Sequence, residues 1–402
     1  MVAIPRYRAH TGQALFSAGF RPFFLLAAGW AALAVPLWLA VYAGIGAVPT
    51  LMPPPIWHVH EMVFGYAMAT VAGFLLTAIP NWTGRLPLQG RPLATLAALW
   101  LAGRVGVFLS ASIGAAAAAV LDLAFPVALL AAIAREIVTG RNWRNLPMVA
   151  ALSLLLAGNA LVHAQPLGWA STAELGNRLG VGTLLMLISL VGGRIVPSFT
   201  RNWLAKNGPP GALPTPFGWV DRCALAVTAA ALAAWVVVPD AAWSAWLELA
   251  AALALAVRLA RWRGIGTWRE PLLWVLHLGY AWLVLGFLLL ATNELVPYLP
   301  PTTALHALTV GAIGTMTLAV MTRASLGHTG RQLAAGPGTT TIYGLVTLAA
   351  GLRLLAPLAG ANYLVALGLA TAAWSGAFGL FVVLYVRPLT TPRVTGTAAR
   401  PP

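Results

Sequence analysis

Charged residues are scarce in this chain of 402 residues. They make up 8% of the sequence, whereas hydrophobic residues make up 60%. A soluble globular protein carries about 25% charged and 45–50% apolar residues, and a disordered chain carries fewer apolar residues still. Both classes are therefore excluded, because a soluble fold cannot shield this much apolar surface from water. The composition indicates a protein whose solvent is the lipid bilayer.

Acidic residues and cysteine are also scarce. The chain has 9 Asp and Glu against 24 Lys and Arg, which gives a net charge of +15, and its single cysteine is Cys223. One cysteine excludes a disulfide framework, a cluster held by several thiolates and a covalent CxxCH haem site. The basic residues occupy short gaps between apolar runs and form no patch, so we expect no nucleic-acid partner.

Long apolar runs dominate the sequence. Runs of about 20 residues predict membrane-spanning helices. We expect an all-α, polytopic membrane bundle of twelve transmembrane helices, at roughly 20–43, 57–79, 92–111, 114–134, 146–164, 178–197, 219–238, 242–260, 271–291, 303–322, 340–358 and 362–386. The positions of Arg and Lys in the connecting segments predict that both termini are cytoplasmic. Residues 1–402 then form a single integral membrane domain, with 389–402 as a disordered tail.

Three of these segments share a residue spacing. A glycine follows His60, Asn177 and His306 after five residues, and a threonine follows each after 23 residues. These residues begin the second, sixth and tenth expected helices, which predicts a pseudo-threefold repeat of four-helix units at about 1–135, 136–262 and 263–388. Three units of four helices are also the plan of haem-copper oxidase catalytic subunits, so the predicted fold resembles theirs by analogy.

Two histidines occupy equivalent positions in this repeat. His60 and His306 begin different helices at the same expected depth, on the outer side of the membrane. Imidazole is a common ligand of haem iron, so the pair could hold a b-type haem (heme b). Arg178 and Arg353 also lie toward this side, and their forked donors suit haem propionates. Alternatively, the histidines belong to an aromatic belt beside Trp57, and the arginines extend to lipid headgroups.

A second set of ligand types lies near the first. His58 is two residues before His60, about 200° around a helix, so a regular helix cannot direct both at one metal. His58 shares a helix face with Glu61. Together with His163 they form a candidate metal site, for which copper is the preferred ion because imidazole suits it. A hydrogen-bonded polar cluster at the helix end is an equally open alternative.

Charged residues also occur within the expected spans, where they mark functional sites by default. Arg104 and Asp122 lie about equally far before and after Gly114, at the turn between two expected helices. We predict that they form a structural ion pair between those adjacent helices.

Several motifs resemble those of the NnrS family. They are Trp57–Met62 (WHVHEM), Ile79–Arg85 (IPNWTGR), Arg194–Asn202 (RIVPSFTRN), Met321–Arg331 (MTRASLGHTGR) and the opening Gly19–Phe24 (GFRPFF). The resemblance covers nearly the whole chain. It implies a haem- and copper-containing protein of the bacterial inner (plasma) membrane, tied to nitric oxide metabolism, denitrification and resistance to nitrosative stress.

The oxidase analogy adds one expectation about the metals. Histidines of the second and tenth helices hold the low-spin haem of haem-copper oxidases, and His60 and His306 match that placement. The copper histidines of those enzymes come from the sixth and seventh helices, which contain no histidine here. An oxygen-reducing centre of the usual type is therefore not expected. A second metal would use the outer cluster, with His277 as a weaker candidate.

Three functions follow from these observations. The first is a redox protein that handles nitric oxide. One form of this function is the reduction of nitric oxide, with electrons from a quinol or another carrier. The second is a transporter for a metal or small anion, which would place a polar path at the membrane midplane. The third is a haem-binding sensor or assembly factor without turnover. The spans contain few midplane polar residues, which favours the first function over the second, whereas the sequence does not separate the first from the third.

Overall fold

The computed structural model describes residues 11–209, 213–239, 241–295 and 300–394, and every regular element in these ranges is a helix. Within them, nine helical segments are long and apolar enough to span a membrane. These segments are Phe20–Tyr42, Pro54–Thr83, Ala115–Thr139, Trp143–Ala164, Ala173–Asn207, Trp219–Val237, Pro271–Asn293, Pro301–His328 and Pro337–Thr390. The all-α, membrane-type fold predicted from the sequence is confirmed.

The predicted number of twelve spans is not confirmed. The expected helices at 92–111 and 242–260 correspond to α4 (Arg91–Phe108) and α11 (Ser244–Ala260), which are not among the nine segments found in the described chain. The last two expected spans form one segment, made of α15 (Pro337–Leu355) and α16 (Tyr363–Thr390). Gly360 lies between them with φ of 55°, a left-handed conformation that reverses the chain and that glycine adopts readily.

The chain forms two compact units. Unit 1 comprises Met1–Gly180, Ala324–Gln332 and Val382–Pro402, and unit 2 comprises Val181–Arg323 and Leu333–Phe381. The predicted repeat units, at about 1–135, 136–262 and 263–388, remain a prediction. Of the predicted tail at 389–402, the first residues belong to the end of α16, and 395–402 lie outside the described residues.

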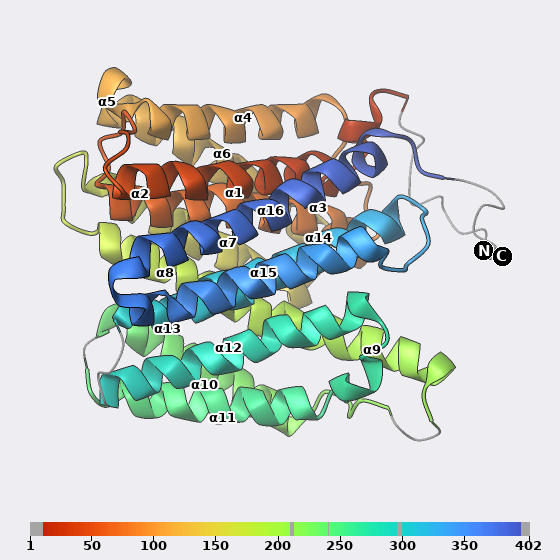
Figure 1. Ribbon diagram of the computed structural model, residues 1–402. Coiled ribbons are helices and arrows are strands. Elements are labelled where there is room, and N and C mark those ends of the chain that lie inside the picture. Colours follow the sequence, from red (N-terminus) through yellow and green to blue (C-terminus); the bar gives the residue numbers. More distant parts are fainter. Residues whose placement is uncertain (1–10, 210–212, 240, 296–299, 395–402) are drawn as a thin grey trace. The chain divides into compact units, whose positions relative to one another are not determined.

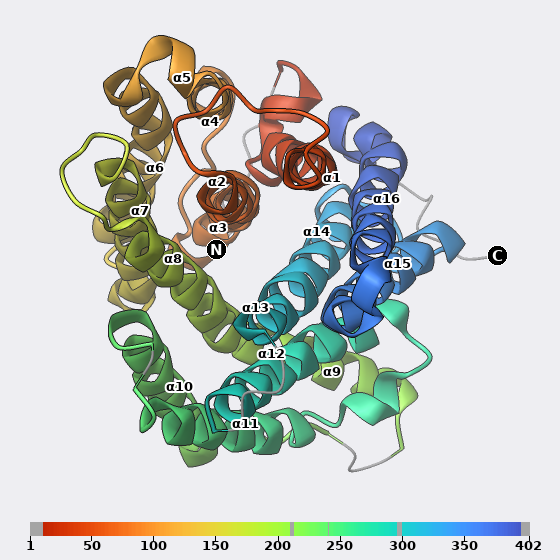
Figure 2. The ribbon, with the colours of Figure 1, turned by 60° about the vertical axis from the view of Figure 1, so that its left-hand side comes forward.

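Unit 1 contains the first helices of the chain (Figure 1). They are α1 (Phe20–Tyr42), α2 (Pro54–His60), the π-helix η2 (Glu61–Ala67), α3 (Met68–Thr83), α4, α5 (Ser110–Ile113), α6 (Ala115–Thr139), α7 (Leu146–Ala164) and the first half of α8 (Ala173–Leu187). Helix α1 packs against α3 and η2, and α6 lies between α4 and α7 (Figure 2). Apolar side chains such as Phe23 and Phe24 fill the spaces between these helices and are fully buried.

Unit 2 contains the helices that follow. They are the π-helix η4 (Ile188–Gly192), α9 (Gly193–Asn207), α10 (Trp219–Val237), α11, α12 (Pro271–Leu295), α13 (Pro301–His306), the π-helix η6 (Ala307–Gly314), most of α14 (Thr315–His328), α15 and most of α16. Helix α11 packs against α10 and α12, and η6 packs against α12 and α15 (Figure 1).

In the described part of the chain, three helical segments contain a π-helical stretch. Two of these stretches, η2 and η6, begin directly after His60 and His306, whereas η4 begins eleven residues after Asn177. A π-helical turn inserts an extra residue, displaces the helix axis and occurs frequently at functional sites. The segments that contain His60 and His306 therefore both have a π-helical stretch directly after the histidine.

Candidate metal centre

Unit 1 encloses a cluster of polar side chains among its apolar helices. The residues come from α2, η2, α4, α6 and α7, and each has at most 4% of its surface exposed. We call this group the His60 cluster; it consists of His60, Glu61, Arg104, Asp122, Asn159 and His163. Buried polar groups require partners, because a lost hydrogen bond or an unpaired charge is costly away from water.

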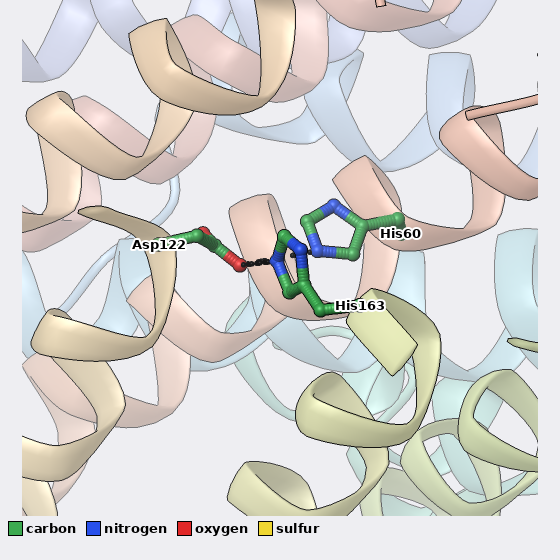
Figure 3. Close-up of side chains that lie close together, drawn as sticks. All are labelled: His60, Asp122 and His163. Carbon is green, nitrogen blue, oxygen red and sulfur yellow. Dashed lines mark hydrogen bonds and ion pairs between the residues drawn. The ribbon is translucent and has the colours of Figure 1, made fainter. Parts of the chain in front are cut away.

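Two imidazoles and one carboxylate meet at the centre of this cluster. Figure 3 shows the rings of His60 and His163 and the carboxylate of Asp122 directed toward one another. Asp122 Oδ2 lies 3.2 Å from His60 Nε2 and 2.9 Å from His163 Nε2. One potential ligand atom of each residue lies within 4.8 Å of the others. Three potential ligand atoms this close together could bind a single metal ion.

Asn159 and Glu61 complete the hydrogen bonds of these residues. Asn159 Oδ1 lies 2.9 Å from His60 Nε2, and Asn159 Nδ2 donates to Asp122 Oδ2 at 2.8 Å. On the other side of the ring, His60 Nδ1 lies 3.0 Å from Glu61 Oε1. A carboxylate on the second ring nitrogen fixes the orientation of a metal-ligating histidine and raises its basicity.

Arg104 binds both carboxylates of the cluster. Its Nη1 donates to Glu61 Oε2 at 2.5 Å, and its Nη2 donates to Asp122 Oδ1. The ion pair between Arg104 on α4 and Asp122 on α6, predicted from the sequence, is confirmed. Arg104 therefore holds Asp122 through one oxygen, while the other oxygen, Oδ2, faces the two imidazoles.

Small residues allow the helices to approach closely here. A Cβ at Gly65 would lie 3.0 Å from both Arg104 Nη1 and Glu61 Oε2, and one at Gly103 would lie 2.9 Å from Asp122 Oδ1. Glycine at these positions therefore makes room for the ion pairs. The carbonyl of Gly65, within the π-helical stretch, accepts a hydrogen bond from Trp100 Nε1 at 3.0 Å.

The net charge of the cluster depends on the protonation of its imidazoles. With neutral imidazoles, one arginine opposes two carboxylates, Glu61 and Asp122, and the sum is minus one. An uncompensated charge at this depth is strongly destabilising. A proton on an imidazole or a bound cation would supply the missing charge. Two imidazole nitrogens and one carboxylate oxygen suit copper, zinc or iron(II), so the residues fit a transition-metal ion.

Comparison with known proteins identifies the family. The model of the NnrS family, described as NnrS protein, matches residues 14–393. The chain belongs to the NnrS family. No curated protein matches it significantly. In this NnrS-family member, the match includes every residue of the His60 cluster.

The predicted copper ligands of this NnrS-family member lie in different surroundings. His163 is part of the His60 cluster, and Glu61 contacts the ring of His60 and the guanidinium of Arg104. The ring of His58 stacks on Trp38 instead, with ring centroids 4.3 Å apart. The structure therefore joins His163 with His60 and Asp122, and His58 is not in that group of potential ligands.

The predicted haem residues are divided between the two units. His60 and Arg178 belong to unit 1, and His306 and Arg353 belong to unit 2. Arg178 is 3.9 Å from Glu174 on the surface of α8, and Arg353 is buried in α15. His306 is half-buried, and its Nδ1 lies 2.5 Å from the carbonyl oxygen of Thr302. The predicted pairing of His60 with His306 remains a prediction.

Little space adjoins His60 within unit 1. The ring is completely buried, and both of its nitrogens contact other side chains of the cluster. A cavity of about 10 Å³ adjoins His163, between Met52, Val107 and Ala118. That volume holds about one water molecule, whereas a porphyrin ring is many times larger. Within unit 1, the surroundings of His60 therefore suit an ion better than a macrocycle.

Sequence reasoning missed Asn159 as a member of the cluster. Asn159 and His163 are four residues apart on α7, so they share a helix face. An amide and an imidazole on one face of an otherwise apolar helix are a signal that periodicity could have provided. His277, the weaker metal candidate, lies in unit 2, where Nδ1 is 3.1 Å from the carbonyl oxygen of Leu273 and Nε2 is 3.3 Å from Thr200 Oγ1.

Proposed function

We propose that this protein is a copper-binding membrane protein that handles nitric oxide, with the ion held by His60, Asp122 and His163. The observation that carries the proposal is the buried group of two imidazoles and one carboxylate, whose charge a cation would complete. The link to nitric oxide comes from membership of the NnrS family. Copper fits the donor set, and the family resemblance implies it.

The residues have distinct roles in this proposal. His60 and His163 are the neutral donors, and Asp122 is the anionic one. Glu61 orients the ring of His60 through Nδ1, and Arg104 holds both carboxylates in place. When bound, copper would supply a redox-active centre that can interact with a small molecule. Nitric oxide is apolar and enters bilayers, so it would approach such a centre from within the membrane.

We propose a b-type haem as a second cofactor, with His306 as a ligand. The contact between His306 Nδ1 and a backbone carbonyl is the arrangement that orients metal-ligating histidines. The π-helical stretches that follow His60 and His306 support the equivalence of these two positions. A haem held by both histidines, with Arg178 and Arg353 at its propionates, is the alternative that the experiment below distinguishes.

We further propose how the protein lies in the cell. It would span the bacterial inner membrane twelve times, with both termini in the cytoplasm. The three units of four helices would follow the plan of haem-copper oxidase subunits. The positions of basic residues in the connecting segments support this orientation. A quinol or another carrier in the bilayer would deliver electrons.

Metal analysis of purified variants tests the proposal. We expect wild type to contain stoichiometric copper, and His60→Ala and His163→Ala to lose most of it. His58→Gln is the matched control, because His58 stacks on Trp38 outside the cluster. Circular dichroism and gel filtration confirm that each variant is folded. Loss of copper in His58→Gln with retention in His60→Ala would instead support the ligand set of His58, Glu61 and His163.

Absorption spectra and nitric oxide assays complete the test. Loss of haem in His306→Ala alone supports His306 as a ligand without His60, whereas loss in both histidine variants supports the paired arrangement. A spectral change with nitric oxide, together with its consumption, supports turnover. A spectral change without consumption favours a sensor or assembly factor. A wild-type protein without copper or haem would exclude the redox function and favour a transporter for a metal or small anion.

A further inference from the structure

Unit 1 contains a cavity that the His60 cluster does not use. Its volume is about 280 Å³, and it lies where several helical segments begin or end. Phe20 is the first residue of α1, His328 is the last of α14, and Arg393 follows the end of α16. Pro80, near the end of α3, forms another part of its wall. Helices that span a membrane begin and end at its surface, so the cavity lies at the depth of the lipid headgroups.

The ionisable groups that line this cavity are basic. Arg21, His328 and Arg393 line it, and no lining residue is acidic. Arg331 is not one of the lining residues but lies beside Arg21, and both guanidinium groups bond to Thr391. Arg21 Nη1 donates to its carbonyl oxygen at 2.7 Å, and Arg331 Nη2 donates to its hydroxyl at 3.2 Å. Three arginines therefore gather at one end of unit 1.

The acidic residues of unit 1 are engaged elsewhere. Glu61 and Asp122 pair with Arg104, Glu136 pairs with Arg85 and Arg135, and Glu174 pairs with Arg178. In the described part of the chain, Arg21, Arg331 and Arg393 form no ion pair with a carboxylate. No carboxylate of the described residues therefore compensates the positive charge of this group.

One of these guanidinium groups is also incompletely bonded. Arg331 Nη1 is buried and has no hydrogen-bond partner among the described residues. All of the hydrogen bonds of Arg21 come from its Nη1, which donates to carbonyl oxygens at the end of α16. Buried donors without partners are costly, and like charges repel at short range. An external anion with several acceptor oxygens would relieve both effects.

We propose that this cavity binds a phosphate group, supplied by the headgroup of an anionic phospholipid. Phosphate oxygens match the forked donors of arginine, which bind them in pairs. The wall also has apolar parts, which include Leu76, Pro80 and the ring of Phe20. The centroid of the Phe20 ring lies 5.4 Å from that of His328. Apolar walls at headgroup depth suit the glycerol and upper acyl region of a lipid. Anionic lipids of the cytoplasmic leaflet attract basic residues in the same way.

Several segments that carry the family resemblance meet at this cavity. They are Gly19–Phe24, Ile79–Arg85 and Met321–Arg331, which contribute Phe20, Arg21, Pro80 and His328 to its lining. The metal proposal uses none of these residues. The lipid site is therefore independent of the copper centre, and either proposal can fail without the other.

Arg331→Gln and Arg393→Gln are the test variants. Arg21 is unsuitable because it bonds to the end of α16, so its loss would disturb the fold. Arg144→Gln is the matched control, since Arg144 is an exposed arginine of unit 1 outside the cavity. The full-length protein is purified in phosphatidylcholine nanodiscs with a minor fraction of phosphatidylglycerol. Native mass spectrometry then counts the lipids that remain bound.

We expect wild type and Arg144→Gln to retain phosphatidylglycerol in preference to phosphatidylcholine. Each test variant should lower the apparent affinity by about tenfold, the effect of one charge-assisted hydrogen bond. A second arm adds inorganic phosphate to the protein in detergent. A rise in Tm that the test variants lack would assign the site to free phosphate. Equal lipid retention in all variants, or no preference and no phosphate effect in wild type, would overturn the proposal.

Discussion

Arg104 shows at the scale of one residue how a membrane-embedded polar cluster is stabilised. A single guanidinium binds Glu61 and Asp122, which come from different helices. All three side chains are almost completely buried, so water cannot replace any of these contacts. Such pairs contribute little net stability compared with apolar packing, but losing one partner leaves a bare charge inside the protein. Arg104 therefore determines whether both carboxylates can remain where the metal proposal requires them.

We predict that Arg104→Met destabilises the protein by about 3–5 kcal/mol, because it leaves two carboxylates buried without their cation. The free energy of unfolding in detergent micelles, measured by denaturant titration, provides the check. The double variant Arg104→Met/Glu61→Gln should recover part of the loss, since it removes one of those charges. Arg135→Gln, which breaks an exposed pair with Glu136, should change stability by less than about 1 kcal/mol. A similarly small effect of Arg104→Met would contradict this account.

Individual residues of the site were predictable, but their grouping was not. His60, His163 and the Arg104–Asp122 pair are visible in the sequence because polar side chains are rare in apolar runs. Their separations, 62 residues from His60 to Asp122 and 41 from Asp122 to His163, carry no information on contact. Helical periodicity also placed His58 with Glu61, whereas the structure stacks His58 on Trp38. Only tertiary packing determines which of two neighbouring histidines faces the cluster.

At the scale of the element, the segment from Pro54 to Thr83 combines three kinds of local structure. It begins as α2, continues as the π-helix η2 and ends as α3. Hydropathy predicted one helix at 57–79. The position of this helix is correct, but hydropathy does not indicate the π-helical stretch. One inserted residue leaves the apolar composition of a helix almost unchanged. It does change the directions of the side chains that follow it. Gly65, within η2, is the position where Arg104 and Glu61 approach the backbone.

We predict that Gly65→Ala destabilises the protein by about 1–3 kcal/mol through overpacking. The added methyl group would lie 2.9 Å from Trp30 Nε1 and 3.0 Å from Arg104 Nη1, so these side chains must move. Gly29→Ala in α1 is the matched control, because nothing lies within 4 Å of its added methyl group. It should leave stability unchanged or raise it by up to about 1 kcal/mol through helix propensity. Equal thermal stability of the two variants would argue against close packing at Gly65.

At the scale of the whole molecule, composition predicted the class of protein well. Few charges and long apolar runs indicated an all-helical membrane protein, and the structure confirms this. The number of spans was harder to predict, because helices at the margin of length or hydropathy can cross the membrane when they pack in a bundle. α11 has 17 residues, and α4 carries Arg91 and Arg104. Arg104 is buried against Glu61 and Asp122, so its charge does not face lipid.

The number of spans has a consequence that can be measured at the two termini. An odd number, such as the nine segments found by length and composition, places the termini on opposite sides of the membrane. Twelve spans place both on the same side. The bias of Arg and Lys in the connecting segments favours the cytoplasm for both. We therefore predict that α4 and α11 cross the membrane and that α15 and α16 are separate spans.

Reporter fusions test this prediction directly. A fluorescent protein that folds only in the cytoplasm should be bright at either terminus, and alkaline phosphatase, active only outside, should be inactive at both. Fusions after Gly114 and after Gly360 are the internal controls, because these turns follow α4 and α15 and should both lie outside. Active phosphatase at one terminus alone would require an odd number of spans. In that case α4 or α11 would not cross the membrane, or α15 and α16 would not be separate spans, and the repeat of four-helix units would be wrong.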